Sequence, residues 1–224
     1  MRKDWKKTAI VILEIAVVYL ILMAIMHFGT AIVNLGNTLF AQMALYVAVY
    51  AVFAAVPILA LLITKTPLSI LKFQKTAVGR QIAWGLCVFA LTMLLYVGLP
   101  LLLGASKSMV LSYKSPTVGI LVFYALFDLI CVGLGEELAF RGYLLGRIMS
   151  ITSVPWLPLL LSALLYGAMY YPITQSWFSV ATATVIGLIY GFFRWKVKNC
   201  TVLSLAIAHG LNEAVIVVAS YFLL

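Results

Sequence analysis

Two short stretches of the sequence carry ionisable side chains at helical spacing. In GEELAFRG, Glu137 and Arg141 are four residues apart, so they lie one turn apart on one helical face, where the guanidinium can neutralise a carboxylate. Glu136 points about 100° away around the helix, which leaves it available for another role such as activating water. The alternative interpretation is an ion-paired helix end with no chemistry.

The second stretch is AIAHGLNEAV, where His209, Asn212 and Glu213 stand at i, i+3 and i+4 and share one face. Three polar groups on one face of an otherwise apolar segment favour a functional site. A metal site made of His209, Glu213 and Glu136 fits the spacing. One imidazole without a second His or Cys is a poor ligand set for a transition metal, so we expect no metal and no cofactor.

The chain that positions these residues is strongly apolar. Of its 224 residues 65% are hydrophobic and 9% charged, and the mean hydropathy is +1.15, which leaves too little charge to coat a soluble domain. Backbone polar groups in lipid must be paired within each segment. The composition therefore predicts one integral membrane domain over residues 1–224, an all-α polytopic bundle.

About seven spans are predicted from the uncharged runs, each long enough or nearly long enough to cross a bilayer. The apolar run after MRKDWKK is interpreted as a retained first span, because no small-residue cleavage site follows it. The predicted spans are 8–28, 38–64, 81–104, 117 to about 135, 156 to about 171, 178–193 and 201–224. The first three make up an N-terminal group within residues 8–104.

The net charge is +9, and the positions of the basic residues along the chain indicate the orientation of the protein in the membrane. Lys107 and Lys114 fall on one side of the predicted topology, and the other basic residues fall on the opposite side. This second group is Arg2, Lys3, Lys6, Lys7, Lys65, Lys72, Lys75, Arg80, Arg141, Arg147, Arg194, Lys196 and Lys198. The positive-inside rule then places the N-terminus in the cytoplasm. We expect a multi-pass protein of a bacterial plasma membrane, with membrane lipids and no nucleic acid among its partners.

Three more ionisable residues fall within the predicted spans. Glu14 lies in the first turns of its helix and can reach toward Lys6 or Lys7, and His27 sits near the outer interface. Asp128 is expected to cap or orient a neighbouring helix. For these residues a structural role is the preferred interpretation.

GEELAFRG is similar to the EExxxR signature of the CPBP family of intramembrane proteases, also called the Abi family, which includes CAAX prenyl endopeptidases and bacteriocin-processing or immunity proteins. SALLYGAMYY follows where the family carries FxxxH, and AHGLNEA follows where it carries HxxxN. The resemblance covers about residues 118–217. Tyr166 matches the Phe of the second motif, but Tyr170 stands in the position of its His. Glu213 stands in the position of the final Asn, with Asn212 one residue earlier.

The resemblance implies hydrolysis of a peptide bond in a membrane-associated or lipidated substrate. Glu136 would be the base that activates water, with Glu137 and Arg141 supporting it. His209, and with it Tyr170, would stabilise the oxyanion, and Asn212 would position these groups. The candidates for substrate contact are Phe140, Tyr166 and Glu213.

Two other functions compete with the protease. A catalytically silent homologue could use the same cavity to bind a peptide, a lipidated segment or a membrane-protein partner as an immunity or regulatory factor. Tyr170 favours this alternative, because a tyrosine hydroxyl cannot exchange protons near neutral pH as imidazole does. A solute transporter is disfavoured, because the sequence has no inverted repeat or matched pair of broken helices.

Overall fold

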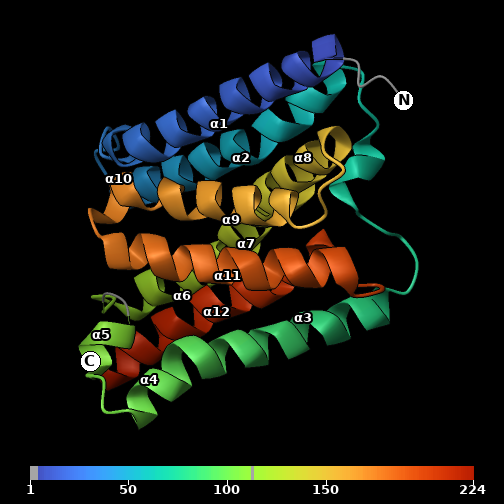
Figure 1. The fold of residues 1–224 in the computed structure, drawn as a ribbon. Helices are drawn as coiled ribbons and strands as arrows, with labels where there is room; N and C mark the ends of the chain where they lie inside the picture. Colours follow the sequence, from blue (N-terminus) through green and yellow to red (C-terminus); the bar gives the residue numbers. More distant parts are fainter. Residues whose placement is uncertain (1–4, 112–113) are drawn as a thin grey trace. The chain divides into compact units, whose positions relative to one another are not determined.

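The computed structural model describes residues 5–111 and 114–224, and the regular secondary structure of this part of the chain is entirely helical. Within it, seven helical segments are long and apolar enough to cross a membrane (Figure 1). The segments are Trp5–Val33, Leu39–Ile63, Val78–Leu102, Val118–Ile151, Leu157–Thr174, Trp177–Lys196 and Val202–Leu223. The predicted all-α polytopic architecture is thereby confirmed. Arg2 and Lys3, which the orientation prediction counts, lie outside the described residues.

The helices group into two compact units, Met1–Lys72 with Leu138–Val197, and Phe73–Glu137 with Lys198–Leu224. The first unit contains α1 (Trp5–Val33), α2 (Leu39–Ile63), the 3-10 turn η1 (Leu68–Leu71), η4 (Leu138–Leu144), α8 (Leu145–Ile151), α9 (Leu157–Met169), α10 (Tyr171–Thr174) and α11 (Trp177–Lys196). The second contains α3 (Val78–Met93), η2 (Leu94–Gly98), α4 (Leu99–Leu102), α5 (Lys107–Val110), α6 (Val118–Phe127), η3 (Asp128–Val132), α7 (Gly133–Glu137) and α12 (Val202–Leu223).

Hydroxyl side chains mark where several of the helices begin. Thr38, Thr117 and Ser176 each accept a hydrogen bond from the backbone N–H three residues later, at the starts of α2, α6 and α11. Such N-caps satisfy donors that the first turn of a helix leaves unpaired. These caps therefore set where α2, α6 and α11 begin.

The core of the first unit is rich in aromatic and aliphatic side chains. Phe53 of α2 packs with Phe140 and Tyr143 of η4 and with Tyr166 of α9, and all four are buried. Ser162 of α9 donates a hydrogen bond to the backbone oxygen of Phe140 at 3.0 Å. The segment that follows the EExxxR glutamates is therefore held inside this unit.

In the second unit, α12 packs against α3, α6, η3 and α7. Glycines allow its backbone to touch its neighbours. A Cβ atom at Gly210 would lie 2.4 Å from the backbone oxygen of Leu129, and one at Gly133 would lie 2.6 Å from that of Ala206. Both contacts are with backbone atoms, so only glycine fits at these positions.

The fourth span does not end near residue 135 as predicted. It continues to Ile151, over 34 residues, which at about 1.5 Å per residue exceeds the thickness of a bilayer core. The wide π-helical turns η3 and η4 lie on either side of α7 within it.

This continuation also corrects the placement of two basic residues. Arg141 and Arg147 are helical and buried, so counting them as loop charges was wrong. The reason is that burial among protein side chains and ion pairing let a helix carry charged residues that would otherwise end a span at the membrane surface.

Glu14 of α1 is bound within the first unit. Its carboxylate accepts hydrogen bonds from the hydroxyl of Tyr143 at 2.9 Å and from Nε of Arg147 at 3.0 Å, and it forms an ion pair with Arg147. Both charged side chains are more than nine-tenths buried. The pair therefore links the first helix to the segment η4–α8.

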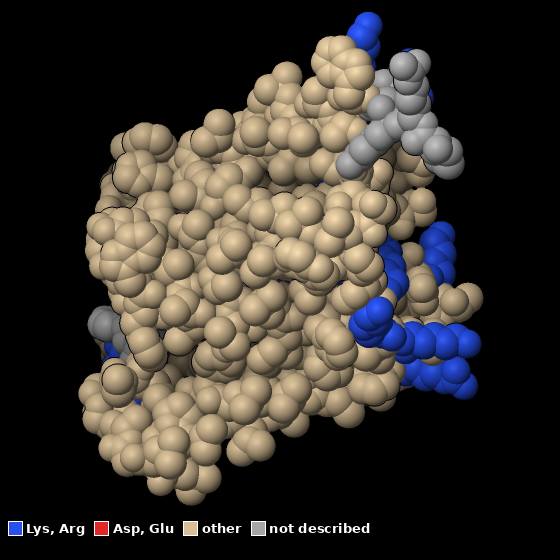
Figure 2. Space-filling view, in the orientation of Figure 1, with Lys and Arg blue, Asp and Glu red and all other residues tan. Residues whose placement is uncertain are grey.

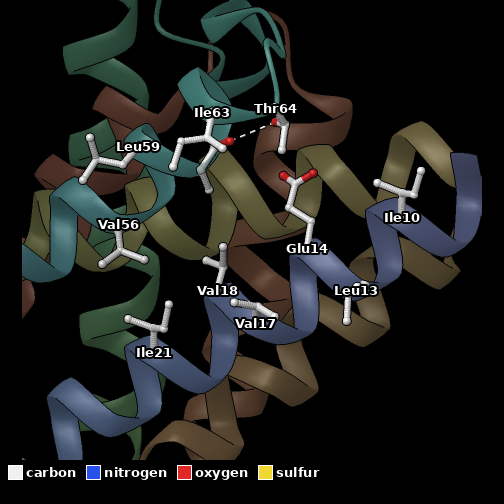
Figure 3. A pocket seen from close by; sticks show the side chains of 11 residues that line it. Ile10, Leu13, Glu14, Val17, Val18, Ile21, Val56, Leu59, Ile63 and Thr64 are labelled. Atoms are coloured by element: carbon white, nitrogen blue, oxygen red, sulfur yellow. Dashed lines mark hydrogen bonds between the residues drawn. The ribbon is translucent and has the colours of Figure 1, made fainter.

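Glu14 also borders an open groove of about 430 Å³ between α1 and α2 (Figure 3). Of the described residues that line the groove, Glu14 alone is ionisable, and the others are aliphatic apart from Thr64. Thr64 satisfies its own hydroxyl by donating to the backbone oxygen of Ala60 at 2.8 Å. The groove is therefore a hydrocarbon surface with its one carboxylate already paired.

Basic side chains lie at helix ends in both units. In the first unit Lys6 and Lys7 open α1, and Lys196 closes α11; in the second, Arg80 lies at the start of α3 and Lys198 just before α12. On the face of the molecule that Figure 2 shows, no Lys or Arg of the described residues is visible along the sides of the helices. This apolar surface is what hydrocarbon contact requires.

We expect Gly210→Ala to lower the stability of the protein, because its methyl group would overlap backbone atoms of Leu129 that cannot rotate away. Overpacking of this kind costs about 1–3 kcal/mol. Thermal unfolding in detergent measures the loss. Gly79→Ala is the matched control, since no atom lies within 4 Å of a Cβ at that position. Equal melting of the two variants would contradict the proposed contact.

Glu14→Gln should destabilise the protein more strongly, because it leaves Arg147 buried without its carboxylate. Removing one partner of a buried ion pair costs about 3–5 kcal/mol, whereas removing both is much milder. The double variant Glu14→Leu with Arg147→Met should therefore unfold closer to wild type than Glu14→Gln does. A single variant as stable as the wild type would show that the pair contributes nothing.

Candidate functional site

Contact between α7 and α12 brings together the ionisable residues of the two chemical motifs in the second unit. Gly133, at the start of α7, lies against Ala206 and Gly210 of α12. His209 is the neighbour of Gly210, and Glu136 and Glu137 are the last residues of α7. Because the backbones touch here, short carboxylate and imidazole side chains can meet.

His209 lies between the two glutamates. Its Nδ1 is 2.9 Å from Oε1 of Glu137, and its Nε2 is 3.9 Å from Oε2 of Glu136. Glu136, Glu137 and His209 are 2%, 0% and 3% exposed. The first distance is that of a charge-assisted hydrogen bond, and the second is too long for a direct one.

This arrangement gives the two carboxylates different roles. The bond to Glu137 fixes the orientation of the imidazole ring, as second partners of functional histidines do. Glu136 keeps a carboxylate oxygen near Nε2 without a direct bond to it. A separation of 3.9 Å can be bridged by one water molecule that is about 2.8 Å from each atom. The geometry is therefore suited to proton transfer involving a polarised water.

Two more carboxylates lie near this cluster. Asp128, at the start of η3, lies within electrostatic range of His209, Glu136 and Glu213. Glu213 follows His209 by one turn of α12 and is partly exposed. Among the described residues, no three His, Cys, Asp or Glu side chains are grouped to hold a metal ion.

Asn212 is held by a residue that the sequence analysis did not identify. Its side-chain Nδ2 donates to Oγ1 of Thr92 at 2.6 Å, and Thr92 in turn donates to the backbone oxygen of Val88 at 2.8 Å. Thr92 lies on α3 and is buried. A lone Thr in an apolar span is a weak signal, and only its spacing of eleven residues from Gln81 could have drawn attention to it.

The remaining candidates lie in the first unit. Arg141 is buried, with its guanidinium carbon 4.0 Å from the ring centre of Tyr166 and 5.3 Å from that of Tyr190. Cation–π contacts of this kind stabilise a buried guanidinium. Phe140 packs edge-on against Tyr166 at 5.0 Å.

Tyr170, in the position of the second-motif histidine, directly follows α9 as its C-cap. Its hydroxyl is 3.0 Å from the hydroxyl of Tyr166, one turn earlier. The tyrosines in the Phe and His positions of the FxxxH pattern thus form a pair of bonded hydroxyls.

The predicted site residues therefore fall into two groups. Glu136, Glu137 and His209 meet directly, and Asn212 and Glu213 lie on the same helix as His209. Phe140, Arg141, Tyr166 and Tyr170 form the aromatic cluster of the first unit. Their catalytic and substrate-binding roles remain predictions.

No curated protein and no solved structure matches the chain significantly. Residues 118–215 match the family profile described as Type II CAAX prenyl endopeptidase Rce1-like. This segment contains all three motifs and both partners of the Glu–His contact. The resemblance to CAAX proteases of the CPBP family that the motifs predict is thereby confirmed over residues 118–215 of this multi-pass membrane protein.

Proposed function

We propose that the protein is an intramembrane endopeptidase that hydrolyses a peptide bond in a membrane-associated or lipidated peptide. The observation that carries the proposal is the buried contact of His209 with Glu137 and Glu136, at 2.9 and 3.9 Å. Buried ionisable groups are costly inside a membrane protein and mark functional sites by default. The match to CAAX prenyl endopeptidases supports the same class of reaction.

Glu136 acts as the general base in this mechanism. Its carboxylate takes a proton from water as the water oxygen attacks the carbonyl carbon, so a C–O bond forms and the carbonyl electrons move onto oxygen. When the tetrahedral intermediate collapses, the C–N bond breaks and the proton on Glu136 passes to the leaving amine. The reaction consumes one water and needs no other reactant.

His209 stabilises the oxyanion. When its ring carries both protons, Nδ1–H donates to Glu137 and Nε2–H is directed toward the region beside Glu136, where the intermediate forms. A preorganised donor of this kind is usually a large contribution to catalysis. Glu137 is therefore a positioning residue for His209.

The other roles follow the motifs. Tyr170 is proposed as a second oxyanion donor, Arg141 as a structural support of the EExxxR segment, and Asn212 as a positioning group. Phe140, Tyr166 and Glu213 are the proposed substrate contacts. We place the protein in a bacterial plasma membrane with its N-terminus in the cytoplasm, supported by the basic residues at helix ends.

A catalytically silent homologue is the second candidate function. It would bind a peptide, a lipidated segment or a membrane protein as an immunity or regulatory factor. The hydrogen bond between Tyr166 and Tyr170 favours this second function, because it gives the Tyr170 hydroxyl a structural role. The imidazole that the family carries at this position is absent from residue 170.

Replacing the base separates these functions. Glu136→Gln should reduce cleavage of prenylated and leader-type peptides at least about 100-fold, because an amide cannot accept the proton of water. The rate of product formation by purified protein in lipid nanodiscs measures this reduction in cleavage. Gln175→Glu, the reverse exchange at an exposed position after α10, is the control and should cleave normally. Equal products from wild type and Glu136→Gln would refute the mechanism.

Tyr170→His tests the second motif. Adding an imidazole donor should increase cleavage about tenfold or more if the protein is an enzyme limited at this position. Tyr170→Phe, which removes the hydroxyl and keeps the ring, should not increase it. If the wild type and Tyr170→His are both folded and neither cleaves any peptide of the panel, the result would favour the silent homologue.

A further inference from the structure

Helices α3 and α12 of the second unit are joined by two buried polar contacts. Thr201, which precedes α12, donates its hydroxyl to the side-chain oxygen of Gln81, and Asn212 donates to Thr92 at 2.6 Å. Gln81, Thr92 and Thr201 are essentially inaccessible, and Asn212 is nearly so. Each contact therefore gives a hydrogen-bond partner to polar groups that are buried in an apolar region.

The two contacts have identical spacing. Both join residues 120 positions apart in the chain, so they are eleven residues apart in each helix. Eleven residues correspond to about three α-helical turns, which returns both pairs to the same faces of two parallel helices. A single alignment of α3 with α12 therefore satisfies both contacts.

Another alignment would be costly. If α12 packed against α3 in a register shifted by one residue, its side chains would face directions rotated by about 100°. Both contacts would then break together. Each buried polar group left without its partner costs about 1–3 kcal/mol. Between the two contacts, a Cβ at Gly85 would lie 2.8 Å from the backbone oxygen of Ser204, so the helices approach too closely to slide freely.

The alignment bears directly on His209. This residue precedes Asn212 by three positions, less than one turn along α12. A shift of one residue would move it about 1.5 Å along the axis and turn it away from Glu137, to which it is bonded at 2.9 Å. A fixed α12 is therefore a condition for the Glu137–His209 bond.

We propose that Thr92, together with Gln81, is a positioning residue that sets the depth and rotation of His209. Both belong to α3, which lies outside the segment matched to the endopeptidase family. Thr92 is well suited to this role. Its hydroxyl proton is used by the backbone oxygen of Val88 at 2.8 Å, so its oxygen presents a fixed acceptor to Asn212. The effect on catalysis rests on the proposed function, whereas the effect on His209 does not.

Histidine NMR tests the proposal without any need for activity. The chain contains two histidines, His27 and His209, so selective 15N labelling gives ring signals from these residues alone. Thr92→Val keeps the shape of the side chain and removes the acceptor. It should shift the ring signals of His209, including the hydrogen-bonded Nδ1, and leave those of His27 on α1 unchanged.

Three further variants make the result specific. Thr92→Ser keeps the hydroxyl and should restore the wild-type His209 signals. Thr182→Val removes a hydroxyl that bonds its own helix at Ser179 and should have no effect. If Thr92→Val fails to fold, the exchange Thr92→Asn with Asn212→Thr keeps a donor and an acceptor in contact and should retain the signals of His209.

A folded Thr92→Val protein with unchanged His209 signals would overturn the proposal, as would a shift of equal size in Thr182→Val. If cleavage is measurable in the wild type, Thr92→Val should lower kcat by about ten- to a hundredfold with little change in KM, and Thr92→Ser should restore kcat. Absence of cleavage in every variant would count against the proposed function, while the NMR result would still decide the role of Thr92.

Discussion

The direct backbone contact of α12 with η3 and α7 is the constraint on which the candidate site depends. Gly210 and Gly133 leave no room for a Cβ atom, and this closeness lets the short side chains of Glu137 and His209 reach one another. Larger residues would separate the helices by more than a carboxylate–imidazole pair can span. Two glycines with no chemistry of their own therefore make the chemistry possible.

Within each unit, some buried polar side chains pair with a side chain of another helix. Glu14 binds Arg147 and Tyr143 in one unit, and Thr92 binds Asn212 in the other. In an apolar environment such pairs contribute less to net stability than to the choice of one alignment, because every other alignment leaves polar groups unsatisfied. The same interactions that fix the helices thereby fix the side chains of the candidate site.

Much of the fold could be predicted because its causes are local. Runs of apolar residues must be helical in lipid, so seven spans follow from composition and length alone. The end of the fourth span could not be predicted in this way. Glu136, Glu137 and Arg141 look like the polar end of a helix, yet the helix continues to Ile151 because these side chains are buried within the protein.

The sequence by itself determined which residues can do chemistry, since the i, i+4 spacing of Glu137 and Arg141 and the i, i+3, i+4 face of His209, Asn212 and Glu213 are properties of one helix. Only the tertiary structure decided that Glu137, rather than Glu136, holds the imidazole, and that Thr92 holds Asn212. Spacing along a chain specifies directions around one axis. Which side chains meet depends on the distance and alignment between two axes, which glycine contacts and paired polar groups set.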